Sequence, residues 1–342
     1  MRNIRNLSML LTVLALTACS AGNAAKPSAE LSFSSMDDLI AAAQEEGEVL
    51  VYTTLTEPDV EKLVEDFEDK YGIQVKPLRL GSNDAITRFD SESEAHAPSA
   101  DLLLVAETRY FADAVERGYV TPLEETGVLA FVPDYPSQFL VRDAGTAVVN
   151  ITNAGWVYNT EAVDEGDLPK TWEDLLDPRW TGKLVGPPAS DEINNLLTLS
   201  MVAEQHGEEF LSQLHGQLLR EYPDMVPMHE AVASGEGFIG LQSVEFFVDA
   251  LASGGAPLGF VSVAPAYYPV HALGVASDAK NPAASRLLAQ YLLSEEGSES
   301  VASGVGVYTP YDEEIPEGFR APTVEHISQV LERKESIQSA YK

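Results

Sequence analysis

The chain has 342 residues, of which 54 are acidic and 21 are basic, and its formal net charge at pH 7 is −33. Nucleic acid is excluded as a partner, because a polyanion would meet a strongly negative field. The length suffices for two domains with cores of their own, and the acids are spread along the chain, as is typical of a solvated acidic surface.

Residues 1–18 have the composition of a secretory signal. Arg2 and Arg5 precede an apolar run, 7–16, that is far shorter than the ~20 residues of a membrane span. The end of this segment, "LTAC", resembles the bacterial lipobox, in which the cysteine is acylated and becomes the new N-terminus. We therefore predict export to the periplasmic or cell-surface face, with the membrane contacted only through a lipid on Cys19. An ordinary signal with an incidental cysteine is the alternative.

Residues 19–36 are mostly small and polar, which predicts a flexible, lipidated tether. Beyond it, helical spacing alternates with β-rich runs. The helical stretches include "EPDVEKLVEDFEDKYG" and "RYFADAVERG", and the β-rich runs are "EVLVYTTL", "IQVKPLRL" and "ADLLLVA". The last run is continuously apolar, which is typical of a buried parallel strand. The alternation predicts an α/β fold with a mostly parallel sheet.

Polar residues that directly follow these strands are the first candidates for a binding site, because such sheets bind ligands at the carboxyl ends of their strands. They are Thr53, Thr54 and Thr56 after the first strand, Ser82 after the second and Glu107 after the third. Thr54, Thr56 and Ser82 would also suit helix N-caps, so both roles stay open.

No motif nominates a catalytic centre. The chain has no HExxH, GxSxG, Walker or GxGxxG pattern at a strand-to-helix junction, and His229-Glu230 lacks a second histidine at metal spacing. Acylation would also remove the only cysteine from nucleophilic and metal chemistry. We predict a binding protein without enzymatic activity or cofactor.

Four stretches carry a family resemblance. "EVLVYTTLTEPDVEKLVEDFEDKYGIQV", "PSADLLLVAETRYFADAVERGYVTPL", "LPKTWEDLLDPRWTGKLVGPP" and "KNPAASRLLAQYLLSEEGSE" occur in this order. Together they resemble the solute-binding proteins of ABC importers, of the type 2 periplasmic binding fold, in the group that includes ferric-ion-binding proteins. The resemblance implies a monomer with two α/β lobes, a solute held between them, and an ABC permease and ATPase as partners. A sensory clamshell lipoprotein is a further alternative.

The resemblance also implies how the chain is divided. We expect lobe 1 over 37–144, lobe 2 over 145–258, and the hinge return with the rest of lobe 1 over 259–311. A C-terminal helical segment, 312–342, would pack on lobe 2. The outward crossing would lie in "AVVNITNAGWVYNT" and the return in "GFVSVAPAYYPVHALGVAS", and both runs are β-rich.

The tyrosine pair of ferric-binding members is missing from its expected place. The matching stretch, "SGEGFIGLQSVEFF", has Gln242, Ser243 and Glu245 there. The histidine expected after the first strand is replaced by threonines, and the expected acid falls at or beside Glu107. We therefore expect Gln242, Ser243 and Glu245 in the cleft of a protein that binds a solute other than iron.

Tyr267 and Tyr268 lie instead on the returning crossing. Consecutive strand residues point to opposite faces, so at most one of them would normally face the cleft. Two phenolates on one metal would need a bulge or loop, which Pro265 and Pro269 permit. Three outcomes stay open: one tyrosine facing the cleft, both packed, or an Fe(III) site formed by Tyr267 and Tyr268 with Glu107.

The start of one helix bears on the class of solute. Ser190 precedes Asp191 and Glu192, which predicts an N-cap with acids in the first turn. These acids disfavour an anion there and, with Glu107 and Glu245, favour a cationic or amine-bearing solute. The alternative is that such acids are incidental in a chain that is rich in them.

Three arginines could bind an anionic group on the same solute. Arg79, Arg88 and Arg109 are available to pair a carboxylate or phosphonate. The sequence therefore predicts a lipoprotein that delivers a small organic solute, amine-bearing or zwitterionic, to an importer. Fe(III) as the transported ligand is the alternative.

Overall fold

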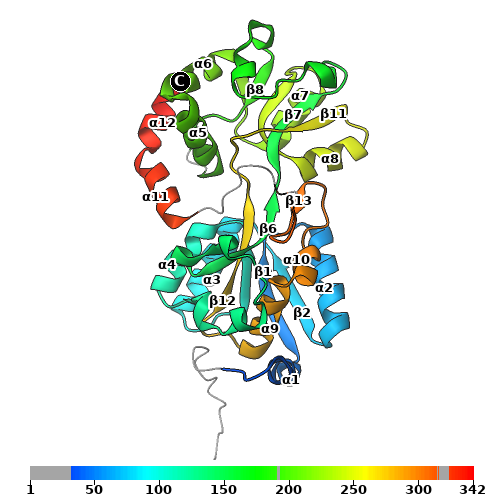
Figure 1. The fold of residues 1–342 in the computed structure, drawn as a ribbon, viewed down its shortest axis with the longest axis vertical. Coiled ribbons are helices and arrows are strands. Elements are labelled where there is room, and N and C mark those ends of the chain that lie inside the picture. Colours follow the sequence, from blue (N-terminus) through cyan, green and yellow to red (C-terminus); the bar gives the residue numbers. More distant parts are fainter. Residues whose placement is uncertain (1–31, 191–192, 314, 316–322) are drawn as a thin grey trace, which may run out of the picture.

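The computed structural model describes residues 32–190, 193–313, 315 and 323–342 (Figure 1). The expected signal, the expected lipidation site Cys19 and most of the expected tether lie outside the described residues, as do Asp191 and Glu192. In the described part of the chain, no helix is long and apolar enough to cross a membrane.

Lobe 1 is built around three parallel strands, with β1 between β2 and β3. Their bounds are β1 Glu48–Thr53, β2 Gln74–Arg79 and β3 Leu102–Val105, and the helices around them are α1 Met36–Glu46, α2 Glu57–Tyr71, α3 Ser82–Glu94 and α4 Thr108–Glu116. Thr56 caps α2, and Gly72 ends it with a left-handed φ of 69°. Helix α2 therefore begins and ends where local chemistry predicts.

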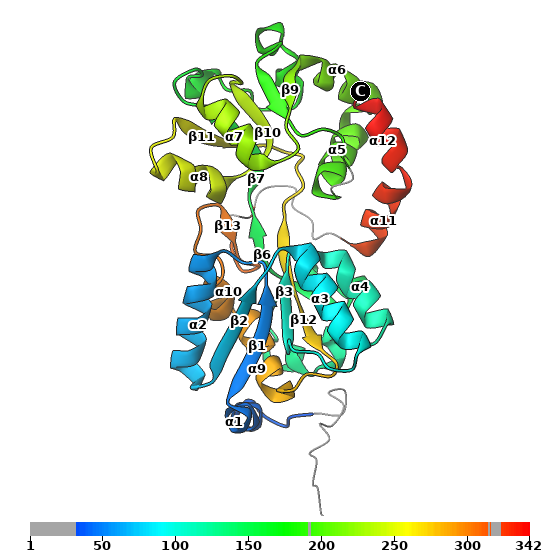
Figure 2. The same ribbon diagram turned by 180° about the vertical axis from the view of Figure 1, so that it is seen from behind.

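Later segments complete the lobe 1 sheet with antiparallel pairs. β12 (Val270–Ala276) pairs with β3, and β6 (Thr146–Thr152) pairs with β12. The remaining strands are β4 Val120–Thr121, β5 Leu140–Val141 and β13 Val307–Tyr308, and the remaining helices are α9 Pro282–Leu292 and α10 Glu295–Glu299. The first residues of β12 pair near the end of β3, so the carboxyl ends of β1 to β3 face the other lobe (Figure 2).

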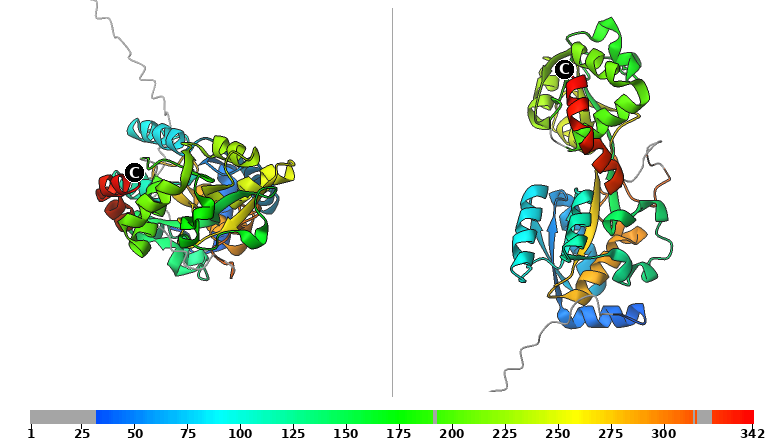
Figure 3. Two further views of the ribbon diagram at one scale, coloured as in Figure 1. Left: turned by 90° about the horizontal axis from the view of Figure 1, so that it is seen from above. Right: turned by 90° about the vertical axis from the view of Figure 1, so that its left-hand side faces the viewer.

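Lobe 2 has a second mixed sheet in the order β11-β7-β10-β8-β9. Its strands are β7 Ala154–Asn159, β8 Leu184–Gly186, β9 Leu218–Glu221, β10 Ile239–Val244 and β11 Leu258–Ser262, and its helices are α5 Ile193–His206, α6 Glu208–Gln217, α7 Met225–Ala233 and α8 Glu245–Ser253. The side view in Figure 3 shows the two lobes stacked along the long axis. The two-lobed α/β architecture with crossover strands is thus confirmed, with sheets that mix parallel and antiparallel pairs.

The crossings lie slightly later than the expected boundaries at 145 and 258. β6 pairs with β12, so residues 146–152 belong to the lobe 1 sheet, and β11 pairs with β7, so residues 258–262 belong to the lobe 2 sheet. The outward crossing therefore falls at Asn153. This position lies inside the stretch expected for the crossing but several residues after the expected lobe boundary, because sheet membership depends on a strand's partner and not on its own pattern.

The C-terminal helices are α11 (Val324–Glu332) and α12 (Lys334–Ala340). Both pack on α5 of lobe 2, and α12 also packs on α6. α11 reaches α4 of lobe 1 as well, so this segment lies along one side of both lobes (Figures 1 and 3).

Asn153 joins the crossing segments. Its Nδ2 donates to Glu245 Oε2 at 2.7 Å, and its Oδ1 accepts from Ser262 Oγ at 3.0 Å. Its backbone N–H donates to the carbonyl oxygen of Gly306 at 2.7 Å. The side chain and backbone of one buried residue thus connect the outward crossing, the end of β11, the start of α8 and the loop before β13.

Candidate functional site

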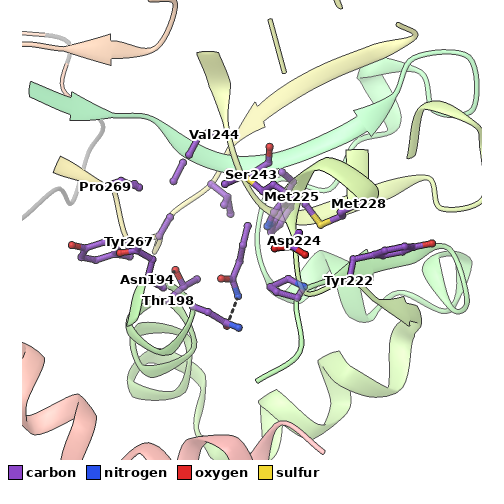
Figure 4. A pocket seen from close by; sticks show the side chains of 18 of the residues that line it. Asn194, Thr198, Tyr222, Asp224, Met225, Met228, Ser243, Val244, Tyr267 and Pro269 are labelled. Carbon is purple, nitrogen blue, oxygen red and sulfur yellow. Dashed lines mark hydrogen bonds between the residues drawn. The ribbon is translucent and has the colours of Figure 1, made fainter. Parts of the chain in front are cut away.

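A pocket of roughly 340 Å³ opens in lobe 2, beside the returning crossing (Figure 4). Its walls come from β7, the start of α5, the turn before α7, the end of β10 and residues 263–269. The lining combines aromatic and methionine side chains with uncharged polar ones. Asp224 is the only charged residue in the described part of the lining.

Gln242 reaches this pocket through an irregular strand. The pairing of β10 with β7 shifts between Gly240 and Ser243, and Gln242 has a φ of 60°. Residues other than glycine rarely adopt this left-handed backbone conformation, and those that do are enriched at binding sites. A bulge of this kind re-aims the side chains at the end of a strand.

The amide orientation of Gln242 is fixed by a neighbouring asparagine. Asn195 Nδ2 donates to the carbonyl oxygen of Pro188, which can only accept. Asn195 Oδ1 therefore accepts, and Gln242 Nε2 donates to it at 3.1 Å. Gln242 can then offer a ligand its carbonyl oxygen, Oε1, as an acceptor and the second N–H of Nε2 as a donor.

His229 fixes the hydroxyl of Ser243 in the same way. His229 Nδ1 lies 2.6 Å from the carbonyl oxygen of Met225, so this nitrogen carries a proton and donates. Burial lowers the pKa of His229 and keeps the ring neutral, so Nε2 accepts the hydroxyl proton of Ser243 at 2.7 Å. The lone pairs of Ser243 Oγ are then what it can offer a ligand.

Aromatic and methionine side chains supply the apolar walls. Trp156 and Trp172 pack edge to face with ring centres 5.2 Å apart, and Trp172 Nε1 donates to the carbonyl oxygen of Pro265 at 2.7 Å. Met225 and Met228 border the side of the pocket where Asp224 begins α7 (Figure 4). The Asp224 carboxylate does not cap its own helix. It is exposed at the rim, where it can meet a cation.

Four of the expected residues line this pocket: Ser190, Gln242, Ser243 and Tyr267. Tyr268 does not line it. It is buried, its hydroxyl donates to the carbonyl oxygen of Val263 at 3.2 Å, and burial raises its pKa. The two tyrosines therefore separate, with Tyr267 at the pocket and Tyr268 in the core, although both lie in the irregular segment between β11 and β12 and not in a strand.

The expected lobe 1 threonines form hydrogen bonds with backbone N–H groups near the ends of β1 and β3. Thr53 Oγ1 accepts from the N–H of Leu55 at 3.1 Å, and Thr54 Oγ1 accepts from the N–H of Ala106 at 3.1 Å. Thr56 Oγ1 accepts from the N–H of Asp59, so its role as an N-cap is confirmed. These hydroxyls hold the edge of lobe 1 that faces the other lobe.

Ser82, Glu107 and Glu245 lie outside the pocket lining. Ser82 begins α3 behind Gly81, which occupies the cap position, and Glu107 precedes α4 on lobe 1. Glu245 begins α8, where its carboxylate accepts from Asn153 at the crossing. Glu245 thus belongs to the hinge and not to the pocket wall, because the chain turns into α8 directly after Val244.

Sequence reasoning missed much of the lining. The missed polar and aromatic residues are Trp156, Trp172, Asn194, Asn195, Thr198, Tyr222 and Asp224. The available signals were a pair of asparagines inside an apolar helix and a "YPD" turn before a helix. Neither indicates a pocket without knowledge of which elements lie opposite.

The described residues contain no group of three or more His, Cys, Asp or Glu side chains that could hold a metal ion. Of the alternative iron ligands Tyr267, Tyr268 and Glu107, only Tyr267 lines the pocket. The structure therefore does not gather that donor set.

Comparison with known proteins relates the chain to one family. Residues 97–324 match the family model described as "Bacterial extracellular solute-binding protein". The chain is 24% identical over 266 residues to an uncharacterized protein of Haemophilus influenzae, covering 75% of this chain and 76% of that one. It is 27% identical to Iron uptake protein A1 of Synechocystis over 208 residues, 59% of this chain and 56% of the relative.

Solved structures share the fold. A Trichodesmium protein in complex with iron and citrate has a TM-score of 0.66 at 20% identity, covering 86% of this chain and 98% of that chain. The periplasmic binding protein AfuA of Actinobacillus pleuropneumoniae, bound to fructose-6-phosphate, has a TM-score of 0.63 at 18% identity, covering 86% and 99%. At such identities the likeness extends to the fold and not to the ligand.

Proposed function

From the premise that the chain belongs to the bacterial extracellular solute-binding proteins, the binding components of ABC importers, we propose that it captures a small organic solute. The solute carries a protonated amine, alone or within a zwitterion. It binds between the lobes and is passed to a membrane permease. We further propose that Cys19 is acylated and holds the exported protein at the membrane.

The observation that carries this proposal is the polarity of the lobe 2 pocket. Gln242 Oε1 and the lone pairs of Ser243 Oγ are left as hydrogen-bond acceptors, because the Ser243 hydroxyl proton and one N–H of Gln242 bond inside the protein. Asp224 adds a carboxylate at the rim. An ammonium or guanidinium group supplies several N–H donors and a positive charge, which match acceptors and a carboxylate. Tryptophan and tyrosine walls also favour a cation.

The same lining argues against a phosphorylated solute in this pocket. Its described residues include no lysine or arginine, whereas sites for phosphate and sugar phosphates supply cationic or N–H donors. Acceptor oxygens would repel such a ligand. The lobe 2 pocket therefore differs in charge from what a bound phosphate requires.

Ferric iron is the second candidate, because two relatives are named iron uptake proteins. It would use Tyr267, which lines the pocket with Asp224. Tyr268 would have to leave the carbonyl oxygen of Val263 and lose a proton that burial holds in place. This cost disfavours a site with two adjacent phenolates.

Binding is coupled to closure of the lobes. The solute first meets the lobe 2 pocket, and the loops at the carboxyl ends of β1, β2 and β3 then cover it, with Thr54 and Glu107 among them. A solute shifts the open and closed populations only by its higher affinity for the closed form. The closed form is the one that a permease would recognise, and a sensory partner would use the same signal.

The test is a thermal-shift screen of the purified mature protein, followed by calorimetry of each compound that stabilises it. The compounds comprise primary amines, guanidines, amino acids, quaternary ammonium salts, dicarboxylates, sugar phosphates and ferric citrate. Compounds with a charged N–H group are expected to raise the Tm, since a ligand that binds only the folded state stabilises it. Stabilisation by ferric citrate or sugar phosphates alone would overturn the proposed solute class.

A further inference from the structure

Arginines in the described part of this acidic chain are almost all neutralised by nearby carboxylates. The pairs are Arg88–Glu92, Arg117–Asp90, Arg142–Glu124, Arg179–Asp167, Arg220–Glu236 and Arg333–Glu204. Arg286 is buried and donates to the carbonyl oxygens of Thr126 and Pro282. With 54 acids in the sequence, a carboxylate near each guanidinium is the expected arrangement.

Arg79 and Arg109 differ from the ion-paired arginines and from the buried Arg286, because they are not fully buried and neither forms an ion pair with any described carboxylate. Arg79 is exposed, and its Nε donates to the carbonyl oxygen of Leu55 at 2.7 Å. This bond uses one of five N–H groups and leaves the guanidinium charge without an anion. Arg109 is half-buried in the first turn of α4.

Both arginines lie at the edge of lobe 1 that faces lobe 2. Arg79 ends β2 and pairs in register with Thr53, which pairs with Leu104 near the end of β3. Arg109 follows β3 by four residues, at the start of α4. The carboxyl ends of these strands point toward lobe 2 (Figure 2).

The two lobes therefore carry complementary groups across the cleft. Lobe 2 offers Gln242 Oε1, Ser243 Oγ and the Asp224 carboxylate, and lobe 1 offers guanidinium groups that lack a carboxylate among the described residues. We propose that the solute is a zwitterion whose cationic amine binds in the lobe 2 pocket. Its carboxylate, or another planar anionic group, is bound by Arg79 and Arg109 when the lobes close.

This inference rests on the proposed function and explains how the closed state gains affinity. A solute held only by lobe 2 would bind open and closed forms alike and would not drive closure. An anionic end that reaches the lobe 1 arginines binds only in the closed form. Guanidinium pairs a carboxylate through two parallel hydrogen bonds, which also fixes the orientation of the solute.

The experiment uses matched pairs of compounds, each an amino acid and the amine that lacks its carboxylate, with α-amino acids and ω-amino acids of increasing length. Calorimetry with the mature protein is expected to show at least one amino acid binding more tightly than its amine. In the R79Q and R109Q variants, we expect the affinity for this amino acid to fall about 10-fold or more, toward the affinity for the amine. The affinity for the amine itself stays unchanged. R79K and R109K, which keep the charge but not the two-point geometry, give intermediate losses.

Arg142→Gln is the control, because Arg142 belongs to the same lobe but its guanidinium already forms an ion pair with the Glu124 carboxylate. It is expected to leave both affinities unchanged. If amines bind as tightly as the amino acids, or if R79Q and R109Q weaken both partners of a pair equally, the zwitterion inference is overturned while the proposed function stands. If neither amines nor amino acids bind, both are overturned.

Discussion

His229 Nε2 and Ser243 Oγ lie 2.7 Å apart, and this hydrogen bond determines which polar atoms the lobe 2 pocket can offer. The carbonyl oxygen of Met225 forces His229 Nδ1 to donate, so Nε2 accepts and Ser243 becomes an acceptor toward the pocket. The carbonyl oxygen of Pro188 acts likewise on Gln242 through Asn195. The backbone carbonyls of Met225 and Pro188 thus help to set the polarity of the pocket.

Ser243→Ala is therefore expected to lower the affinity for an amine-bearing solute about 10-fold, because it removes an acceptor worth about 1–2 kcal/mol. Calorimetry with the compounds that stabilise the wild type measures the loss. Ser234→Ala is the matched control, since Ser234 follows α7 and its hydroxyl bonds the carbonyl oxygen of Ala231 outside the pocket. Equal affinities in wild type and Ser243→Ala would contradict the assigned hydrogen-bond directions.

Gly306→Ala is expected to destabilise the hinge. Gly306 has a φ of 68°, and an added Cβ would lie 2.2 Å from Glu245 Oε2, whose carboxylate also bonds Asn153. The variant must therefore strain the backbone and displace that carboxylate, which together cost about 2–4 kcal/mol of unfolding free energy. Denaturant unfolding of both proteins measures the difference.

Gly118→Ala separates the two causes. Gly118 has a φ of 73°, but no atom lies within 4 Å of its added Cβ. Only the backbone strain applies, so the expected loss is about 1 kcal/mol. A loss as large as that of Gly306→Ala would show that contact with Glu245 is unimportant.

Asn153→Ala is expected to cost about 2–4 kcal/mol of unfolding free energy, because Glu245 and Ser262 would both lose a buried partner. Glu245→Gln keeps an oxygen that can accept from Asn153 Nδ2, so its loss should stay below about 1 kcal/mol. Thermal or denaturant unfolding of the two variants gives the comparison. A larger loss for Glu245→Gln would point to the charge, and not the hydrogen bond, as the stabilising element.

His271 makes folding stability depend on pH. Burial lowers the pKa of His271 from 6.5 to about 4, although Asp59 and the backbone of Thr54 act in the opposite direction. Between these values the unfolded chain binds a proton that the folded chain does not. Stability is therefore fully present above about pH 6.5 and falls as the pH drops toward 4, by on the order of 3 kcal/mol in total.

His271→Gln is expected to remove this part of the pH dependence. Unfolding free energies measured from neutral pH to about pH 4 should fall less steeply in the variant than in the wild type. Burial also lowers the pKa of His229, so some slope in the same range persists in both proteins. Identical slopes would mean that His271 is protonated equally in the folded and unfolded chains.

Local patterns in the sequence predicted helix ends well. Thr56 and Gly72 bound α2 as capping chemistry requires, and only one of Tyr267 and Tyr268 lines the pocket, as expected, although the segment that carries them is not a strand. The crossing at Asn153 and the pocket residues Asn195 and Asp224 could not be predicted in this way. Their roles depend on partners far along the chain, such as Gln242 opposite Asn195.

The two tyrosines make the iron alternative directly testable. The Tyr268 hydroxyl donates to the carbonyl oxygen of Val263, and burial raises its pKa. We therefore expect it to stay protonated when chelated Fe(III) is added. No visible charge-transfer band that depends on both tyrosines should then appear in the mature protein. Tyr267→Phe and Tyr268→Phe are the variants to compare.

A band that both of them abolish would show that the returning crossing rearranges around the metal, and the cargo would then be iron. A band lost only in Tyr267→Phe would assign one phenolate, since Tyr267 alone of the pair lines the pocket.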